Sequence, residues 1–342
     1  MRIWLPSIRA RSGSDVYVER LADALRAHGA EPIVQWFPHA YQYFPWALCR
    51  EPAPRNTDVI NANSWIAFAF QRKPTPLVAT ALHCVAGRGY PEWKSLQQAF
   101  FHDHMVRRFE RASFLAADAA VAISESTRKE VCQDFHVHNI RAIPLWVDVD
   151  DFSPGDFPIE GHQELTRILI IGNMSRRKGG DLIGPFCEAL GGEFKVTVVA
   201  GLRGQALRVA AHGAKLQFKS GLTKAQLINA YRSTDIVVSL SRHEGFGYTA
   251  LEGMSCGKPV VAFNASGLRD VVVHGQTGLL TPIGDVTAIA KACRLLRQQP
   301  ETARTMGQHG RQRAITEFTA DRAIDAHLRL YSELLSRGRS TC

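Results

Sequence analysis

Short apolar runs alternate with longer amphipathic stretches along nearly the whole chain, and turn residues separate them. Such runs predict buried strands, and the stretches between them predict helices. In the first half the expected strands are Arg2–Leu5, Pro32–Phe37, Asp58–Asn61, Leu77–Ala81, Ala119–Ser124 and Arg141–Pro144. In the second half they are Arg167–Gly172, Lys195–Ala200, Lys215–Lys219, Asp235–Leu240, Pro259–Phe263 and Gly278–Thr281. The alternation indicates an α/β fold with parallel sheets that are covered by helices.

One interruption divides this alternation, the aspartate-rich and proline-bearing stretch Asp148–Pro158. We therefore expect two Rossmann-like domains, at residues 1–155 and 156–320, followed by a C-terminal helix over residues 321–342. A length of 342 residues suits two domains better than one, and a hydrophobic fraction of 45% supports two sizeable cores.

The most informative chemistry lies within residues 239–263. An apolar strand ends there at a turn that carries Glu244, Gly245 and Gly247, and a helical stretch that holds Glu252 follows. The order of strand, glycine turn and helix is typical of a phosphate-binding crevice, because glycines let the backbone approach a ligand. The two carboxylates could accept hydrogen bonds from the hydroxyls of a sugar and of a ribose. The alternative is an ordinary strand, turn and helix with surface glutamates.

A second candidate phosphate site opens the second half of the chain. The segment Ile170–Gly179 places a strand, a glycine and the three adjacent cations Arg176, Arg177 and Lys178 in sequence. Cations at the end of a strand can neutralise a diphosphate as it leaves. The alternative is a solvated basic turn.

Two candidates lie in the first half. The loop Ile8–Asp15 contains Gly13, between a strand and a helix that Ser14 could cap. The expected strand Leu77–Ala81 delivers His83 to its carboxyl edge, where loops often carry function. The alternatives are a capped helix start that binds no ligand and an ordinary surface histidine.

The spacing of the two glutamates identifies a family. Glu244 and Glu252 are separated by seven residues within Glu-Gly-Phe-Gly, and Gly-Lys-Pro-Val-Val follows up to Val261. This block resembles the motif of the family 4 retaining glycosyltransferases. The resemblance implies the GT-B architecture, in which two facing Rossmann-like domains hold the donor in the cleft between them. It also implies that the last helix crosses back to the first domain.

The resemblance further implies a role for each candidate residue. Glu244 would lie beside the transferred sugar, Glu252 on the nucleotide ribose, and Lys178 on the phosphates. Relatives carry an arginine at the position of Asn173, which has no charge. Arg176 or Arg177 would supply the missing positive charge. The residues implied to act in the reaction are Glu244, His83 and Lys178. Those implied to bind the donor are Gly13, Arg176, Arg177, Lys178, Gly245, Phe246, Gly247 and Glu252.

The activity implied is transfer of a hexose from a nucleotide diphosphate sugar to an acceptor hydroxyl with retained configuration, in surface polysaccharide, lipopolysaccharide or glycolipid assembly. No cofactor or divalent metal is expected, since the pair Asp148 and Asp150 is a poor site for a hard metal. A nucleotide-sugar epimerase or hydrolase on the same fold is one alternative. A catalytically silent nucleotide-sugar-binding module is another. The motifs leave the sugar, the nucleotide base and the acceptor open.

The net charge of +9 calls for an anionic partner. Besides a nucleotide sugar this could be an anionic membrane, because the segment Trp93–Leu115 mixes aromatic residues and arginines as a basic amphipathic helix does. The alternative is that its apolar stripe packs on its own domain. Nucleic acid is not expected, since the chain has no lysine-rich tail, zinc finger or aromatic RNA-binding strand.

The chain contains no run close to the ~20 apolar residues of a membrane span, and no signal peptide is expected, because the apolar start Met1–Pro6 is too short and too quickly interrupted. Its seven cysteines are scattered and never form a Cys-x-x-Cys pair, which is typical of reduced thiols. A cytoplasmic protein is therefore expected, either in solution or at the inner face of the membrane.

Overall fold

The computed structural model describes residues 1–84, 96–155, 165–200 and 212–339, which form two compact units. The first unit comprises Met1–Leu145 and Ala320–Cys342, and the second comprises Trp146–Thr319. The division thus falls earlier than residue 155, because the linker packs on the second unit. The Phe152 ring lies edge-on to Tyr231 at 5.9 Å, and its carbonyl accepts a hydrogen bond from Ser255 at 2.6 Å.

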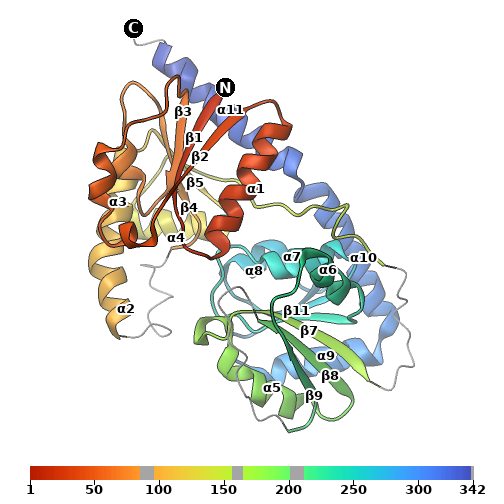
Figure 1. Cartoon of the computed structure of the whole chain (residues 1–342). Coiled ribbons are helices and arrows are strands. Elements are labelled where there is room, and N and C mark those ends of the chain that lie inside the picture. Colours follow the sequence, from red (N-terminus) through yellow and green to blue (C-terminus); the bar gives the residue numbers. More distant parts are fainter. Residues whose placement is uncertain (85–95, 156–164, 201–211, 340–342) are drawn as a thin grey trace. The chain divides into compact units, whose positions relative to one another are not determined.

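The first unit is built on a six-stranded sheet in the order β2-β1-β3-β4-β5-β6, in which all neighbours are parallel. Its strands are β1 (Arg2–Ile8), β2 (Glu31–Phe37), β3 (Val59–Asn63), β4 (Leu77–Ala81), β5 (Ala119–Ala122) and β6 (Ile140–Ala142). Its α-helices are α1 (Gly13–Ala27), α2 (Leu96–Phe101), α3 (Arg107–Ala116), α4 (Glu125–Phe135) and α11 (Ala320–Arg339). Helices α1 and α11 lie on one side of this sheet and α3 on the other (Figure 1).

The second unit repeats the architecture with the order β12-β11-β10-β7-β8-β9, again parallel throughout. Its strands are β7 (Thr166–Gly172), β8 (Phe194–Ala200), β9 (Lys215–Lys219), β10 (Ile236–Ser239), β11 (Val260–Phe263) and β12 (Gly278–Thr281). Its α-helices are α5 (Ile183–Leu190), α6 (Lys224–Arg232), α7 (Tyr248–Ser255), α8 (Ser266–Val271), α9 (Val286–Gln298) and α10 (Pro300–Glu317). The α/β fold with two parallel sheets is confirmed, and each expected strand is present with ends shifted by at most three residues.

Successive side chains of β10 point to opposite faces of the sheet, and each face is covered by its own layer of helices. Val238 belongs to a buried cluster that also contains Phe186 of α5 and Ile289 of α9. The neighbouring Val237 faces α7, where a Cβ added at Gly253 would lie 2.8 Å from its Cγ2. Because successive side chains of a strand point to opposite faces, α7 can approach the sheet closely on the second face.

Local hydrogen bonds to side chains stabilise the segments where α1 and α4 begin. Ser124 caps α4 by accepting a hydrogen bond from the Thr127 amide at 3.0 Å, a role for which serine is a preferred residue. The expectation that Ser14 caps α1 is wrong, because Ser14 lies inside the helix, which starts at Gly13. The carboxylate of Asp15 instead accepts hydrogen bonds from the loop amides of Ala10 and Arg11, at 3.0 and 2.8 Å.

The last helix, α11, packs on the first unit. Asn61 of β3 donates a hydrogen bond to the buried hydroxyl of Tyr331 at 2.7 Å, and Arg141 of β6 donates to Glu333 at 3.1 Å. The N-terminal end of α11 lies beside α1, since the ring of His28 is 3.2 Å from Asp321. These contacts join segments from the two ends of the chain.

Of the segment expected to form a basic amphipathic helix, residues 93–95 lie outside the described residues. The remainder forms α2, a π-helical turn (His102–Val106) and α3. The apolar stripe of α3 packs internally, with the Phe109 ring 5.9 Å from Phe68 and the Phe114 ring 5.3 Å from Phe135. Phe100, by contrast, is 65% exposed. Packing on its own domain therefore accounts for the stripe of α3 and for Phe101 of α2, whose ring lies 5.2 Å from that of Tyr43, but not for Phe100.

Candidate functional site

The candidate site lies where β7 and β10 end. These strands are parallel neighbours, with Ile168 opposite Ile236. The loops after their carboxyl ends therefore meet at the same edge of the sheet, where ligands bind in α/β folds. One loop carries the cations of residues 176–178, and the other carries the turn of residues 241–247.

The loop after β7 is shaped by local polar contacts. The Asn173 side-chain oxygen accepts a hydrogen bond from the Ser175 hydroxyl at 2.6 Å, and Ser175 caps the short 3-10 helix Arg176–Lys178. Gly179 follows with φ of 74°, and a Cβ at this position would lie 2.3 Å from the carbonyl oxygen of Leu240. Asn173 thus shapes the turn, and the glycine lets it pack directly against the end of β10.

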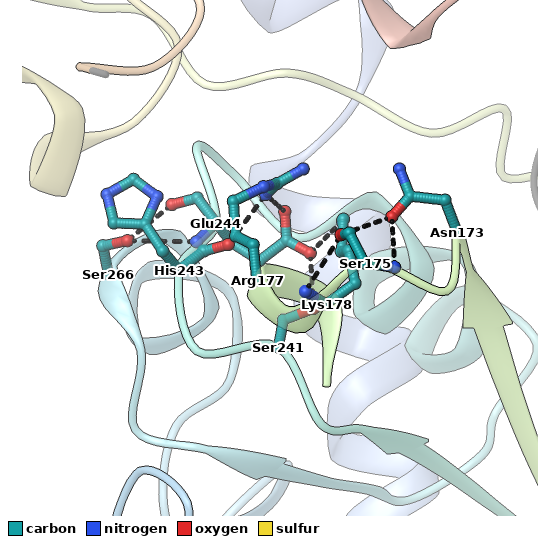
Figure 2. A network of polar contacts seen from close by, with 8 residues as sticks. All are labelled: Asn173, Ser175, Arg177, Lys178, Ser241, His243, Glu244 and Ser266. Atoms are coloured by element: carbon teal, nitrogen blue, oxygen red, sulfur yellow. Dashed lines mark hydrogen bonds and ion pairs between the residues drawn. The ribbon is translucent and has the colours of Figure 1, made fainter. Parts of the chain in front are cut away.

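Glu244 is the centre of the site (Figure 2). Its Oε1 contacts Lys178 Nζ and accepts a hydrogen bond from the Ser241 hydroxyl at 2.9 Å. Its Oε2 lies 3.9 Å from a guanidinium nitrogen of Arg177. Arg176 is exposed, so Arg177 is the arginine of this loop that approaches the glutamate. The structure therefore brings together Lys178, Arg177 and Glu244.

The charged side chains of this network shift one another's pKa values. Burial alone would raise the pKa of the Glu244 carboxyl, but the cations of Lys178 and Arg177 outweigh burial and lower this pKa to about 2. Burial lowers the pKa of Lys178, and Glu244 opposes that effect. Glu244 is thus a carboxylate at any physiological pH, and it can accept hydrogen bonds but not donate them.

Arg242 connects the two loops, although no motif in the sequence predicted this role. Its guanidinium donates to both carboxylate oxygens of Asp181, at 2.6 and 2.9 Å. The same guanidinium donates to the Arg176 carbonyl at 2.5 Å, and the Arg242 amide donates to the Arg177 carbonyl at 2.9 Å. Bidentate pairs of this kind are geometrically specific. The signal in the sequence was an arginine directly between an apolar strand and the glycine turn.

The backbone of Glu244 is held from the other side by α8. The Ser266 hydroxyl donates to the Glu244 carbonyl at 2.6 Å, and the Gly267 amide donates to the same oxygen at 2.9 Å. A Cβ at Gly267 would lie 2.5 Å from the backbone nitrogen of Phe246, so glycine is required for this approach. The Phe246 ring is buried 5.8 Å from that of Phe318, and its side chain therefore stabilises the turn.

Gly247 and Glu252 belong to the start and the body of α7. Gly247 is the N-cap residue and has φ of 109°, a conformation that favours glycine. Glu252 is buried, and its Oε2 accepts a hydrogen bond from the hydroxyl of Tyr231 at 2.8 Å. Tyr231 comes from α6 and was also missed, since no local pattern links it to Glu252.

Gly13 and His83 belong to the first unit. Gly13 is the first residue of α1, and a Cβ added there would meet no atom within 4 Å. His83 follows β4, and its ring lies 6.2 Å from that of Trp65. Their roles toward a ligand stay predictions.

Comparison with known families agrees with this architecture. A model of glycosyl transferases group 1 matches residues 157–313, and a model of glycosyltransferase family 4 matches residues 32–151. The chain belongs to the family 4 glycosyltransferases.

Curated relatives of this chain match it mainly over short segments. It is 31% identical to N-acetyl-alpha-D-glucosaminyl L-malate synthase of Bacillus anthracis over 102 residues, which are 30% of this chain and 27% of that protein. It is 36% identical to D-inositol 3-phosphate glycosyltransferase of Saccharomonospora viridis over 115 residues, 34% of this chain and 26% of the relative. The chain thus spans about a quarter of the length of these two relatives. A longer match, to D-inositol 3-phosphate glycosyltransferase of Geodermatophilus obscurus, is 26% identical and covers 84% of this chain and 70% of the relative.

Solved structures match this chain over nearly its whole length. Sucrose-phosphate synthase from Thermosynechococcus elongatus has a TM-score of 0.82 at 20% identity, covering 98% of this chain and 100% of that one. HepE of Anabaena, in complex with UDP-glucose, has a TM-score of 0.73 at 18% identity, covering 98% and 100%. WaaG, a glycosyltransferase of lipopolysaccharide biosynthesis, has a TM-score of 0.69 at 15% identity, covering 95% and 99%. These matches establish the GT-B fold.

Within the described ranges, no helix is both long and apolar enough to cross a bilayer. Over the same residues, no three His, Cys, Asp or Glu side chains are grouped so that they could hold a metal ion.

Proposed function

We propose that this glycosyltransferase moves a hexose from a nucleotide diphosphate sugar to an acceptor hydroxyl with retained anomeric configuration. The observation that carries the proposal is the buried Glu244 carboxylate beside Lys178 and Arg177, at the carboxyl end of β10. Neighbouring folds support the donor class, because HepE of Anabaena has been crystallised with UDP and with UDP-glucose.

The role that we propose for each side chain follows from its charge. In the reaction, the bond from the anomeric carbon to the phosphate oxygen breaks, and its electron pair leaves with the nucleoside diphosphate. The acceptor oxygen bonds to the anomeric carbon, and its proton passes to the leaving phosphate. Lys178 and Arg177 stabilise the negative charge that develops on that phosphate. Glu244 accepts hydrogen bonds from sugar hydroxyls, and Glu252 accepts them from the ribose. We assign no nucleophile.

We infer that the acceptor is a saccharide or a lipid-linked saccharide in the assembly of a surface polysaccharide, lipopolysaccharide or glycolipid. WaaG, a structural neighbour, acts in lipopolysaccharide biosynthesis. His83, at the end of β4, is the candidate for a hydrogen bond near the reacting centre. No cofactor enters this scheme.

An aromatic surface on the first unit supports contact with an anionic membrane. It consists of Tyr43, Phe44, Trp46 and Phe100, which are between 45% and 65% exposed. Exposed arginines of α3 follow in the chain, and amphipathic aromatic rings next to cations suit a lipid headgroup region. We expect the protein to sediment with vesicles that contain anionic lipid and not with neutral ones. Equal sedimentation with both, or with neither, would contradict this part of the proposal.

The experiment that tests the function is a product analysis with and without acceptor, over a panel of UDP- and GDP-sugars. Transfer with retained configuration, absolutely dependent on acceptor, is expected. Glu244→Ala should lower turnover by about 100-fold or more, because the carboxylate contacts the reacting sugar, while circular dichroism shows a folded protein. Turnover like that of the wild type would remove Glu244 from the reaction. Release of free or epimerised sugar without acceptor would favour a hydrolase or an epimerase.

A further inference from the structure

The cations proposed to bind phosphate already have a counter-ion within the protein. Lys178 Nζ contacts Glu244 Oε1, and a guanidinium nitrogen of Arg177 lies 3.9 Å from Glu244 Oε2 (Figure 2). The Ser241 hydroxyl also donates a hydrogen bond to Oε1. The three charged side chains are only 10% to 25% exposed, so water screens them weakly. A nucleotide that binds here must therefore compete with Glu244 for Lys178.

The outcome of that competition depends on what the nucleotide carries. When a phosphate takes Lys178, the Glu244 carboxylate loses its closest partner and lies near a second negative charge. A buried charge without its partner is costly. A sugar hydroxyl can donate a hydrogen bond to the carboxylate and replace that partner. A nucleoside diphosphate without sugar brings no such donor.

We propose that Glu244 is a specificity-determining residue that makes the site prefer the sugar-bearing donor over the nucleoside diphosphate product. In this proposal Glu244 exchanges Lys178 for sugar hydroxyls when the donor binds, and it repels the diphosphate once the sugar has gone. The inference rests on the proposed function and adds a role in product release to it.

The test compares equilibrium binding of two ligand pairs, UDP with UDP-glucose and GDP with GDP-mannose, by calorimetry. The measured quantity is the ratio of the Kd of the bare nucleotide to the Kd of the sugar nucleotide. Glu244→Gln keeps the size of the side chain and removes its charge. We expect it to bind the bare nucleotide at least about tenfold more tightly and the sugar nucleotide no more tightly, so the ratio falls at least about tenfold.

Ser241→Ala is the matched control, because it removes a hydrogen bond to the same oxygen and keeps the charge. Its ratio should stay within about twofold of the wild-type ratio. Glu244→Asp, which keeps the charge on a shorter arm, should give an intermediate ratio and serves if Glu244→Gln does not fold. A double mutant with Lys178→Met should abolish the effect of Glu244→Gln, since the competition is for Lys178.

The possible outcomes separate this inference from the function on which it rests. If the wild type binds both members of a pair and Glu244→Gln weakens both equally, Glu244 is merely structural and the inference is wrong. If the wild type binds no nucleoside diphosphate and no nucleotide sugar, the proposed function fails and this inference fails with it.

Discussion

At the residue scale, the second carboxylate of the site is held by a buried tyrosine. The Tyr231 hydroxyl is 2.8 Å from Glu252 Oε2 and 3.2 Å from the Thr249 carbonyl, and the tyrosine has no exposed surface. Since a hydroxyl has one hydrogen to donate, the shorter contact to the charged oxygen is the stronger. Tyr231 therefore fixes the direction in which Glu252 presents its carboxylate, and with it the proposed contact to the ribose.

Tyr231→Phe should weaken this positioning without removing the carboxylate. We expect the KM for the donor to rise about tenfold while kcat changes less, because the lost contact concerns ground-state binding. The preference for UDP over 2′-deoxy-UDP should shrink by a similar factor. Tyr331→Phe is the control, since it removes another buried tyrosine hydroxyl, in the first unit. If both variants lowered the preference equally, Tyr231 would have no special link to the ribose.

At the scale of elements, the site depends on close approach between a turn and a strand end. The short helix Arg176–Lys178 lies against the end of β10 because Gly179 has no side chain. Arg242 ties the same two segments through the Arg176 and Arg177 carbonyls. The cations are thus positioned by backbone packing, which a single added carbon would disturb.

Gly179→Ala should test this packing. The added Cβ would lie 2.3 Å from the Leu240 carbonyl oxygen, at a φ of 74° that side chains disfavour. We expect a loss of about 3 kcal/mol in the free energy of unfolding and a strong loss of nucleotide binding. Gly192→Ala is the control, because a Cβ there meets nothing within 4 Å, and it should change stability by less than about 0.5 kcal/mol. Equal effects of the two variants in chemical denaturation would show that the approach is not tight.

At the scale of the whole molecule, two buried titratable groups of the first unit make opposite contributions to the dependence of stability on pH. Glu110 accepts a hydrogen bond from the Ser64 hydroxyl at 3.0 Å, and burial raises its pKa to about 8 from 4.5. His327 on α11 donates to the Ala323 carbonyl at 2.8 Å, and burial lowers its pKa to about 4 from 6.5. Between these two folded-state pKa values, from about 4 to about 8, both groups are neutral in the folded protein.

The signs of the two effects are opposite. As the pH rises from 4.5 to 8, the unfolded chain releases the proton of Glu110 and the folded chain keeps it, so stability falls. As the pH falls from 6.5 to 4, the unfolded chain protonates His327 and the folded chain does not, so stability falls as well. The two slopes cancel between pH 4.5 and 6.5, and a plateau of stability is expected there.

Glu110→Gln should remove the alkaline decline. In the wild type, this one proton contributes a slope of about 1.4 kcal/mol per pH unit between pH 6.5 and 8. Denaturant titrations of the first unit's transition at several pH values measure that slope. Ser64→Ala, which keeps the carboxyl, should retain it. A slope that persists in Glu110→Gln would assign the decline to another group.

Much of this molecule could be predicted from local patterns. All strands were expected within three residues, since apolar runs between turn residues reflect burial of the central strands on both faces, while the edge strand β9 shows only an alternation of exposed and half-buried positions. The block from Glu244 to Val261 identified the family, which the family models confirm. The start of α1 was misplaced because Ser14 suits an N-cap by residue type alone, whereas the helix starts at Gly13 and the carboxylate of Asp15 binds the loop amides.

The amino-acid sequence by itself determined the fold class, the glycine turn with its two carboxylates and the separate run of three cations, because periodicity and backbone requirements are local properties of the chain. Only the tertiary structure decided that Lys178 and Arg177, rather than Arg176, approach Glu244, and that Tyr231 holds Glu252. The physical reason is the strand order. Strands β7 and β10 are neighbours in the sheet although β8 and β9 lie between them in the chain, so their loops meet only after the sheet has assembled.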